Sequence, residues 1–155
     1  MSEESAAPTR SDSENVVSKT ITVARDVGGA FRTWTEQIHR WWPSGHSISG
    51  DPATRVILEG REGGRFFERT SAGIEYDWGR VLLWDPPHRL IFHWFLGSGP
   101  HLPTRVEVQF IPLNPQTTRV HLEHHGPDLI GELWWTMKGR YSAAWDVVLG
   151  RFGEM

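Results

Sequence analysis

The alternation of apolar and polar residues predicts β-strands over most of the chain. Residues 18–25 alternate, with Ile21 and Val23 on one side of the expected strand. Six further strand-like runs are separated by turn residues such as Gly63-Gly64 and Asn114-Pro115. They span residues 55–62, 65–70, 75–84, 89–96, 104–113 and 117–125. Consecutive strands joined by short turns are typical of an antiparallel meander.

Three segments have helical spacing. Asp26 is a candidate N-cap for a short helix that includes Ala30 and Trp34, and a second short helix is expected over residues 36–41. A long helix is expected over residues 129–152, where large apolar residues recur every three or four positions. These are Trp134, Met137, Tyr141, Trp145, Val148 and Phe152. One strand, two short helices, six strands and one long helix form an α+β order.

Length and composition narrow the class of protein. The 155 residues fit one domain, expected over residues 18–155, and the Ser, Glu and Ala-rich residues 1–17 are typical of a disordered tail. The absence of cysteine excludes disulfides, thiolate nucleophiles and cysteine-ligated zinc. A net charge of -3 disfavours nucleic-acid binding. Since no apolar run is long enough for a membrane span and no signal-peptide pattern is present, we expect a cytoplasmic protein without membrane insertion.

The nine tryptophans are many for this length. Each has a large apolar surface to bury and one N–H that prefers a partner. The tryptophans could form a bulky ordinary core or line a ligand pocket, because such pockets are themselves mostly apolar and aromatic. The segment 43–54, rich in Gly, Pro and Ser, is a loop that could border an opening.

The order of motifs along the chain resembles a known superfamily. The matching stretches are TITVARDVGGAFRTWTEQIHRWWP, GGRFFERT, WGRVLLWDPPHRLIFHW, TRVEVQF and TRVHLEHHG. Together they are similar to bacterial relatives of the C-terminal domain of the activator of heat-shock-protein ATPase, within the START-like (SRPBCC) superfamily. The resemblance covers about residues 18–152. It implies a helix-grip fold, in which a curved antiparallel sheet wraps around the C-terminal helix and leaves an internal cavity.

Pattern and resemblance together predict the residues that bind a ligand in that cavity. They are Trp42, Phe66, Trp78, Phe92, Trp94, Phe110, His124, Trp134, Tyr141 and Trp145. Both faces of the strand at residues 75–84 carry large apolar side chains, so the sequence leaves open which face lines the cavity. The Trp41-Trp42 pair, with His46 nearby, could close the cavity as a lid or seal the junction between helix and sheet.

The segment HLEHHG holds the densest group of polar side chains. Alternation places His121, Glu123 and His125 on the outer face and His124 in the core. The outer three are acceptable zinc ligands by type, but alternate side chains of a strand lie about 7 Å apart, so we expect a solvated face and no metal or cofactor. His124 must satisfy its ring nitrogens with a core partner or a ligand.

Glu75 and Asp77 share one strand face and are spaced like an acid/base pair. General acid-base catalysis would need one of them to be buried, and a solvated strand face is the alternative. The chain has no Gly-rich phosphate loop, no G-x-S-x-G elbow and no HExxH motif, which disfavours nucleotide-dependent, serine-nucleophile and zinc-protease enzymes.

Three functions remain as hypotheses. The first is binding of a small hydrophobic or amphipathic molecule, such as a lipid, a polyketide-like compound or an aromatic metabolite. The second is a cyclase, dehydratase or hydrolase in which His124 or Asp77 moves a proton on an apolar substrate. The third, implied by the resemblance, is a module that contacts a heat-shock ATPase chaperone. A homodimer contact is a further partner hypothesis. Fold alone does not decide among them, because this superfamily hosts several functions.

Overall fold

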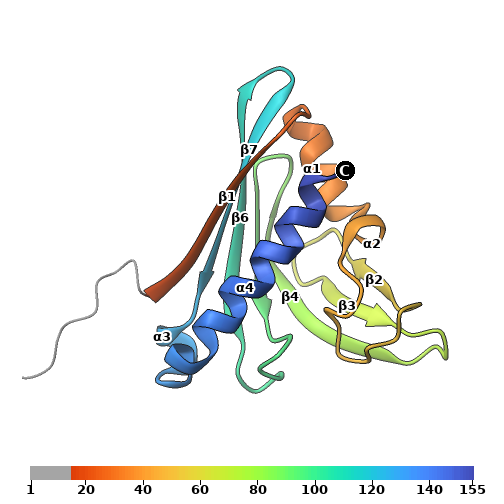
Figure 1. Cartoon of the computed structure of the whole chain (residues 1–155), viewed down its shortest axis with the longest axis vertical. Coiled ribbons are helices and arrows are strands. Elements are labelled where there is room, and N and C mark those ends of the chain that lie inside the picture. Colours follow the sequence, from red (N-terminus) through yellow and green to blue (C-terminus); the bar gives the residue numbers. More distant parts are fainter. Residues whose placement is uncertain (1–14) are drawn as a thin grey trace, which may run out of the picture.

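The computed structural model describes residues 15–155 and folds them around one antiparallel sheet (Figure 1). The strands are β1 (Val16–Val23), β2 (Arg55–Leu58), β3 (Arg65–Arg69), β4 (Glu75–Asp85), β5 (Arg89–Trp94), β6 (Thr104–Asn114) and β7 (Thr117–His125). Their order in the sheet is β1-β7-β6-β5-β4-β3-β2. Strands β2 to β7 therefore form the predicted meander, and β1 pairs with β7 at the edge.

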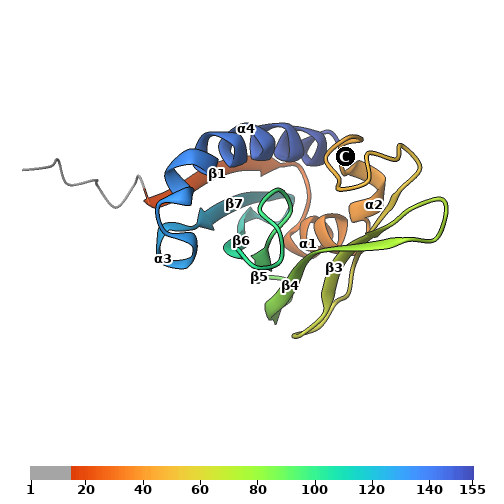
Figure 2. The ribbon, with the colours of Figure 1, turned by 90° about the horizontal axis from the view of Figure 1, so that it is seen from below.

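The helices lie on the concave side of the sheet. They are α1 (Val27–Thr35), α2 (Ile38–Trp41), α3 (Pro127–Ile130) and α4 (Leu133–Gly153). Figure 1 shows α4 running obliquely across the strands, and Figure 2 shows the sheet curling around α1 while α4 lies along its open side. This arrangement confirms the predicted α+β helix-grip fold. In residues 15–155, no helix is long and apolar enough to cross a membrane.

Several element boundaries differ from the sequence prediction, and three of them matter most. The long C-terminal helix is broken: α3 ends at Gly131, whose φ of 62° lies in the left-handed region, and α4 begins at Leu133. The strand expected over residues 55–62 ends at Leu58, since the next residues form a turn in which Gly64 N–H donates to Arg61 O. β1 begins at Val16, and the tail expected over residues 1–17 otherwise falls on residues outside the described range.

Period-two alternation sorts the side chains of the central strands as predicted. The inward positions are all buried, and they are Leu90, Phe92, Trp94, Val106, Val108, Phe110, Val120, Leu122 and His124. The helices fill the concave side with aromatic rings. Trp41 lies against Trp34 and Phe152, with ring centroids 5.6 and 5.1 Å apart. Asp26 caps α1 as expected, because its carboxylate accepts a hydrogen bond from Gly29 N–H.

Candidate functional site

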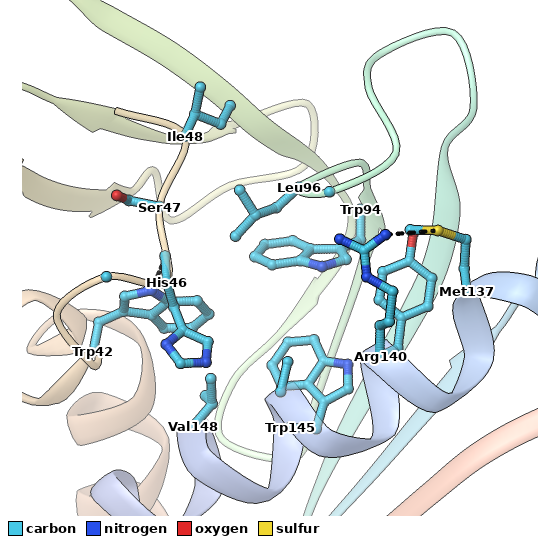
Figure 3. Close-up of a pocket in the computed structure, with 14 residues that line it drawn as sticks. Trp42, His46, Ser47, Ile48, Trp94, Leu96, Met137, Arg140, Trp145 and Val148 are labelled. Atoms are coloured by element: carbon cyan, nitrogen blue, oxygen red, sulfur yellow. Dashed lines mark hydrogen bonds between the residues drawn. The ribbon is translucent and has the colours of Figure 1, made fainter. Parts of the chain in front are cut away.

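A pocket of about 380 Å³ lies at one end of the aromatic core. Three segments form its walls: the loop after α2, the end of β5 and one face of α4 (Figure 3). The lining residues are Trp42, Gly45, His46, Ser47, Ile48, Trp94, Leu96, Gly97, Met137, Arg140, Tyr141, Ala144, Trp145 and Val148. Exposed Ile48 and Arg140 lie at its mouth, so the pocket is open to solvent on that side.

Side-chain size explains why space remains at this end. The α4 wall consists of residues on one face of the helix, and the small Ala144 lies among bulkier side chains there. On the facing walls, Gly45 and Gly97 contribute no side chain, and both have positive φ values that glycine adopts without strain. Aromatic rings therefore hold the helix and the sheet apart but do not fill the gap between them.

Three tryptophans form the interior walls of the pocket. The ring centroid of Trp94 lies 5.5 Å from that of Trp145 and 5.9 Å from that of Trp42. The indole N–H of Trp42 donates a 2.7 Å hydrogen bond to the carbonyl of His46, which ties the loop to the pocket wall. The site is thus a rigid aromatic frame with a loop bonded across one side.

The structure divides the ten predicted site residues into two groups. Trp42, Trp94, Tyr141 and Trp145 line the pocket. The other six are buried in the core behind or beside it, and they are Phe66, Trp78, Phe92, Phe110, His124 and Trp134. Of the Trp41-Trp42 pair, Trp41 is fully buried at the junction of helix and sheet, whereas Trp42 faces the pocket. The loop at residues 43–54 does border the opening, as its composition suggested.

His124 is a core histidine with both ring nitrogens bonded. Trp145 Nε1–H donates to Nδ1 over 2.8 Å, and Nε2 lies 2.6 Å from the hydroxyl of Thr104. Because that hydroxyl donates to Trp94 O, Nε2 must carry the proton. Burial, together with the charge of His125, lowers the pKa of His124 to about 3. The ring is therefore neutral, and its nitrogens are engaged within the core.

The other polar residues of HLEHHG lie on the outer face of β7, as predicted. The Glu123 carboxylate lies 3.0 Å from Nε2 of His121 and 3.2 Å from Nε2 of His125. Hydrogen bonds from His121, with its charge and that of His125, outweigh partial burial and lower the pKa of Glu123. No group of three or more potential ligands in residues 15–155 is arranged to hold a metal ion.

Glu75 and Asp77 lie on the outer face of β4 and are not among the residues that line the pocket. Arg65 contacts both carboxylates, at 3.1 and 2.8 Å, and Arg69 contacts Glu75 at 2.8 Å. Hydrogen bonds from Arg69 and Arg65 lower the pKa of Glu75. The neighbouring Trp78 points inward and is fully buried, which answers the question that the sequence left open about this strand.

Glu68 is the important polar residue that the sequence interpretation missed. It is fully buried, and its carboxylate accepts hydrogen bonds from the loop beside the pocket: Ile48 N–H at 2.6 Å, Ser49 Oγ at 2.6 Å and Thr54 Oγ1 at 2.8 Å. Trp78 Nε1 donates another, at 2.9 Å. Burial by itself raises the pKa of Glu68, but these donors together lower it below its ordinary value. A charged Glu68 therefore holds the loop in place.

The pocket contains polar atoms that have no partner in the described part of the chain. The Tyr141 hydroxyl and Nδ1 of His46 are both buried and lack a hydrogen bond. At the mouth, the Arg140 guanidinium contacts Met137 Sδ at 3.7 Å, the dashed line in Figure 3. An apolar pocket with a few unsatisfied polar groups is the usual form of a small-molecule site.

Comparison with known proteins assigns the family. The family model described as Activator of Hsp90 ATPase homolog 1-like protein matches residues 26–147. The chain therefore belongs to this family, which agrees with the START-like resemblance of its motifs. A search of curated proteins finds no match to the chain.

Solved structures show the same fold. The anthrahydroquino-γ-pyrone synthase Txn09 is 29% identical, with a TM-score of 0.60, and the alignment covers 90% of this chain and 95% of that one. CalC, a self-sacrificing resistance protein from Micromonospora echinospora, is 26% identical, with a TM-score of 0.69 and coverage of 91% and 93%. A protein from Rhodobacter sphaeroides, 19% identical with a TM-score of 0.69 and coverage of 92% of each chain, shares the fold.

Proposed function

We propose that this protein binds a small, largely aromatic molecule in the pocket between α4, the end of β5 and the loop after α2. The observation that carries the proposal is the pocket itself, whose volume of about 380 Å³ and tryptophan walls match small-molecule sites. Flat rings would stack against Trp42, Trp94 and Trp145 without a large rearrangement of the frame. The name of the 29% identical synthase, which refers to a polycyclic aromatic product, supports the same class of molecule.

Thermal unfolding in the presence of a ligand panel tests this proposal. The panel contains tricyclic and tetracyclic aromatic ketones, flat phenols and long-chain fatty acids. A ligand present at about 100 times its Kd stabilises the folded state by about 2.7 kcal/mol, which raises Tm by several degrees. We expect aromatic compounds to give this shift and to quench tryptophan fluorescence saturably. No shift and no quenching across the panel would refute the proposal.

A matched pair of variants locates the binding site. Ala144→Phe fills the pocket from the α4 wall, whereas Ala143→Phe adds the same side chain on an exposed position of the helix. We expect the first variant to lose the ligand-induced shift and the second to retain it. Equal effects of the two variants would mean that the ligand binds elsewhere.

Ring-closing chemistry on the bound molecule is a second candidate function. It is favoured by the name of the 29% identical synthase and by Tyr141, a lining residue whose hydroxyl makes no well-aligned hydrogen bond in residues 15–155. Burial raises the pKa of Tyr141, so the phenol stays protonated and can donate a hydrogen bond to a carbonyl oxygen. Mass spectrometry of each panel compound that binds tests this function. If every compound keeps both its mass and its chromatographic retention after incubation with the protein, binding without turnover remains, because a ring closure by addition leaves the mass unchanged.

A further inference from the structure

The lining of the pocket carries a positively charged side chain but no negatively charged one. Arg140 is the one Lys or Arg among the lining residues, and no Asp or Glu is among them. The Glu68 carboxylate is not among the lining residues and is already bonded to donors from Ile48, Ser49, Thr54 and Trp78. A cationic ligand would therefore find no counter-charge in this site, whereas an anionic ligand would find one.

The Arg140 guanidinium has no acidic partner in the described residues. Its recorded contact is the weak one to Met137 Sδ, whereas other arginines, such as Arg65 and Arg151, contact carboxylates within 3.4 Å. Figure 3 shows the guanidinium of Arg140 over the pocket, beside Trp94. A planar guanidinium has five N–H donors in a fork that matches a carboxylate, sulfonate or phosphate.

Two further polar atoms belong to side chains that line the pocket. The Tyr141 side chain has a relative exposure of 5%, and its hydroxyl makes no well-aligned hydrogen bond in residues 15–155, although Ser98 and Thr104 lie near enough to oppose the rise in its pKa that burial causes. Nδ1 of His46, on the opposite wall, is also buried and unpartnered. Leaving such groups unsatisfied costs free energy, and ligand oxygens near Arg140 and Tyr141 would recover it.

We propose that the ligand is an aromatic acid, whose rings lie against Trp42, Trp94 and Trp145 and whose anionic group is bound by Arg140 with the Tyr141 hydroxyl. This proposal rests on the proposed binding function and adds the chemical class of the ligand. The acidic group lies at the mouth, where it keeps part of its hydration, and the apolar rings enter first. The α4 wall thus supplies both the apolar surface and the charge recognition.

Two fluorescent probes that differ in one acidic group test the proposal. 8-Anilinonaphthalene-1-sulfonate and N-phenyl-1-naphthylamine share the same aromatic framework, but the second lacks the sulfonate. A charge-assisted contact at a partly exposed site changes affinity by about tenfold. We expect the sulfonate probe to bind about tenfold more tightly than the neutral one. The difference should shrink as salt is added, because salt screens the pair.

Two variants test whether Arg140 causes the difference in affinity between the two probes. Arg140→Gln should weaken the sulfonate probe by about tenfold and change the neutral probe by less than about twofold. Arg151→Gln, an equal change of charge at an exposed position of the same helix, should alter neither. If Arg140→Gln leaves the affinity of the sulfonate probe unchanged, or weakens both probes equally, recognition of an acid by Arg140 is wrong.

The pocket-filling variant Ala144→Phe distinguishes a failure of acid recognition from a failure of the proposed binding function. If Ala144→Phe blocks both probes but they bind the unaltered protein equally, the pocket binds aromatic molecules without recognising an acid. If neither probe binds, or if Ala144→Phe blocks neither, the pocket is not the binding site and both proposals are refuted.

Discussion

The indole N–H of Trp145 donates a 2.8 Å hydrogen bond to Nδ1 of His124, so a pocket residue and a core residue fix each other's orientation. Protonation of Nδ1 would place two donors against each other, and the buried ring would carry a charge without compensation. Burial of the ring, together with the charge of His125, lowers the pKa of His124 to about 3. The orientation of one pocket wall therefore depends on a neutral His124.

Acidification should destabilise the fold through His124. The unfolded chain has the ordinary pKa of 6.5 at this residue, and the folded protein has about 3. The contribution of neutral His124 to folding stability is present in full above pH 6.5. It is lost as the pH falls towards 3, by up to about 1.4 kcal/mol per pH unit. In urea unfolding, His124→Gln should be less stable than wild type at pH 7, by about 1–3 kcal/mol. The difference in stability between the two proteins should narrow between pH 6.5 and 4.5. If their stabilities changed in parallel with pH, the lowered pKa of His124 would be contradicted.

Gly126, between β7 and α3, lies where the chain has no room for a side chain. A Cβ added there would collide with the ring of Trp134. Gly126→Ala should therefore destabilise the protein by about 2 kcal/mol or more, measured by urea unfolding. Gly139→Ala in the middle of α4 is the matched control, because an added Cβ meets nothing within 4 Å there. It should stabilise the protein by about 0.5–1 kcal/mol, and a loss comparable to that of Gly126→Ala would rule out the steric explanation.

The fold was predictable because period-two and period-3.6 patterns are local properties of the chain. Alternation along residues 120–124 placed His124 inward and Glu123 outward, and both positions are confirmed. The break before α4 was not predicted, since the apolar stripe continues through residues 129–152 and a single left-handed Gly131 interrupts the helix.

The pocket was less predictable because a pattern gives the face of a residue but not its depth. Phe92 and Trp94 share a face of β5, yet only Trp94 lies at the pocket. Glu68 shares the inward face with Phe66, two positions earlier in β3, and that spacing was the available signal for a buried carboxylate. Arg140 could have been found from its spacing of three residues from Met137. The position of Ile48 depends on its hydrogen bond to Glu68, 20 residues away along the chain, which no local pattern encodes.

The Tyr141 hydroxyl should cost the unliganded protein stability. It is buried, and no partner for it is found in residues 15–155. Tyr141→Phe removes an unsatisfied polar atom and keeps the ring against His124, whose centroid lies 4.3 Å away. We expect the variant to be as stable as wild type or more stable by about 1 kcal/mol in urea unfolding. A loss of more than about 1 kcal/mol would mean that the hydroxyl is bonded in the folded protein.

The carboxylate of Glu68 should determine the stability of the loop beside the pocket. Glu68→Gln replaces one acceptor oxygen with an NH₂ donor, which would face N–H or O–H donors from Ile48, Ser49, Thr54 or Trp78. A buried mismatch of this kind costs about 2 kcal/mol or more. Because the folded pKa lies below the ordinary 4.5, this contribution is present above that pH and is lost as the pH falls through the folded value.

Hydrogen exchange distinguishes a loosened loop from a general loss of stability. In Glu68→Gln, amide exchange in residues 45–54 should accelerate much more than exchange in β6 and β7, because the donors to Glu68 come from the loop and from Trp78 in β4, and none comes from β6 or β7. Glu62→Gln, an equal change of charge at an exposed turn, should alter neither region. Since Ile48 and Ser47 line the pocket, the loosened loop should also weaken ligand binding. Uniform acceleration in the loop and the sheet would show that Glu68 stabilises the whole fold rather than the pocket wall.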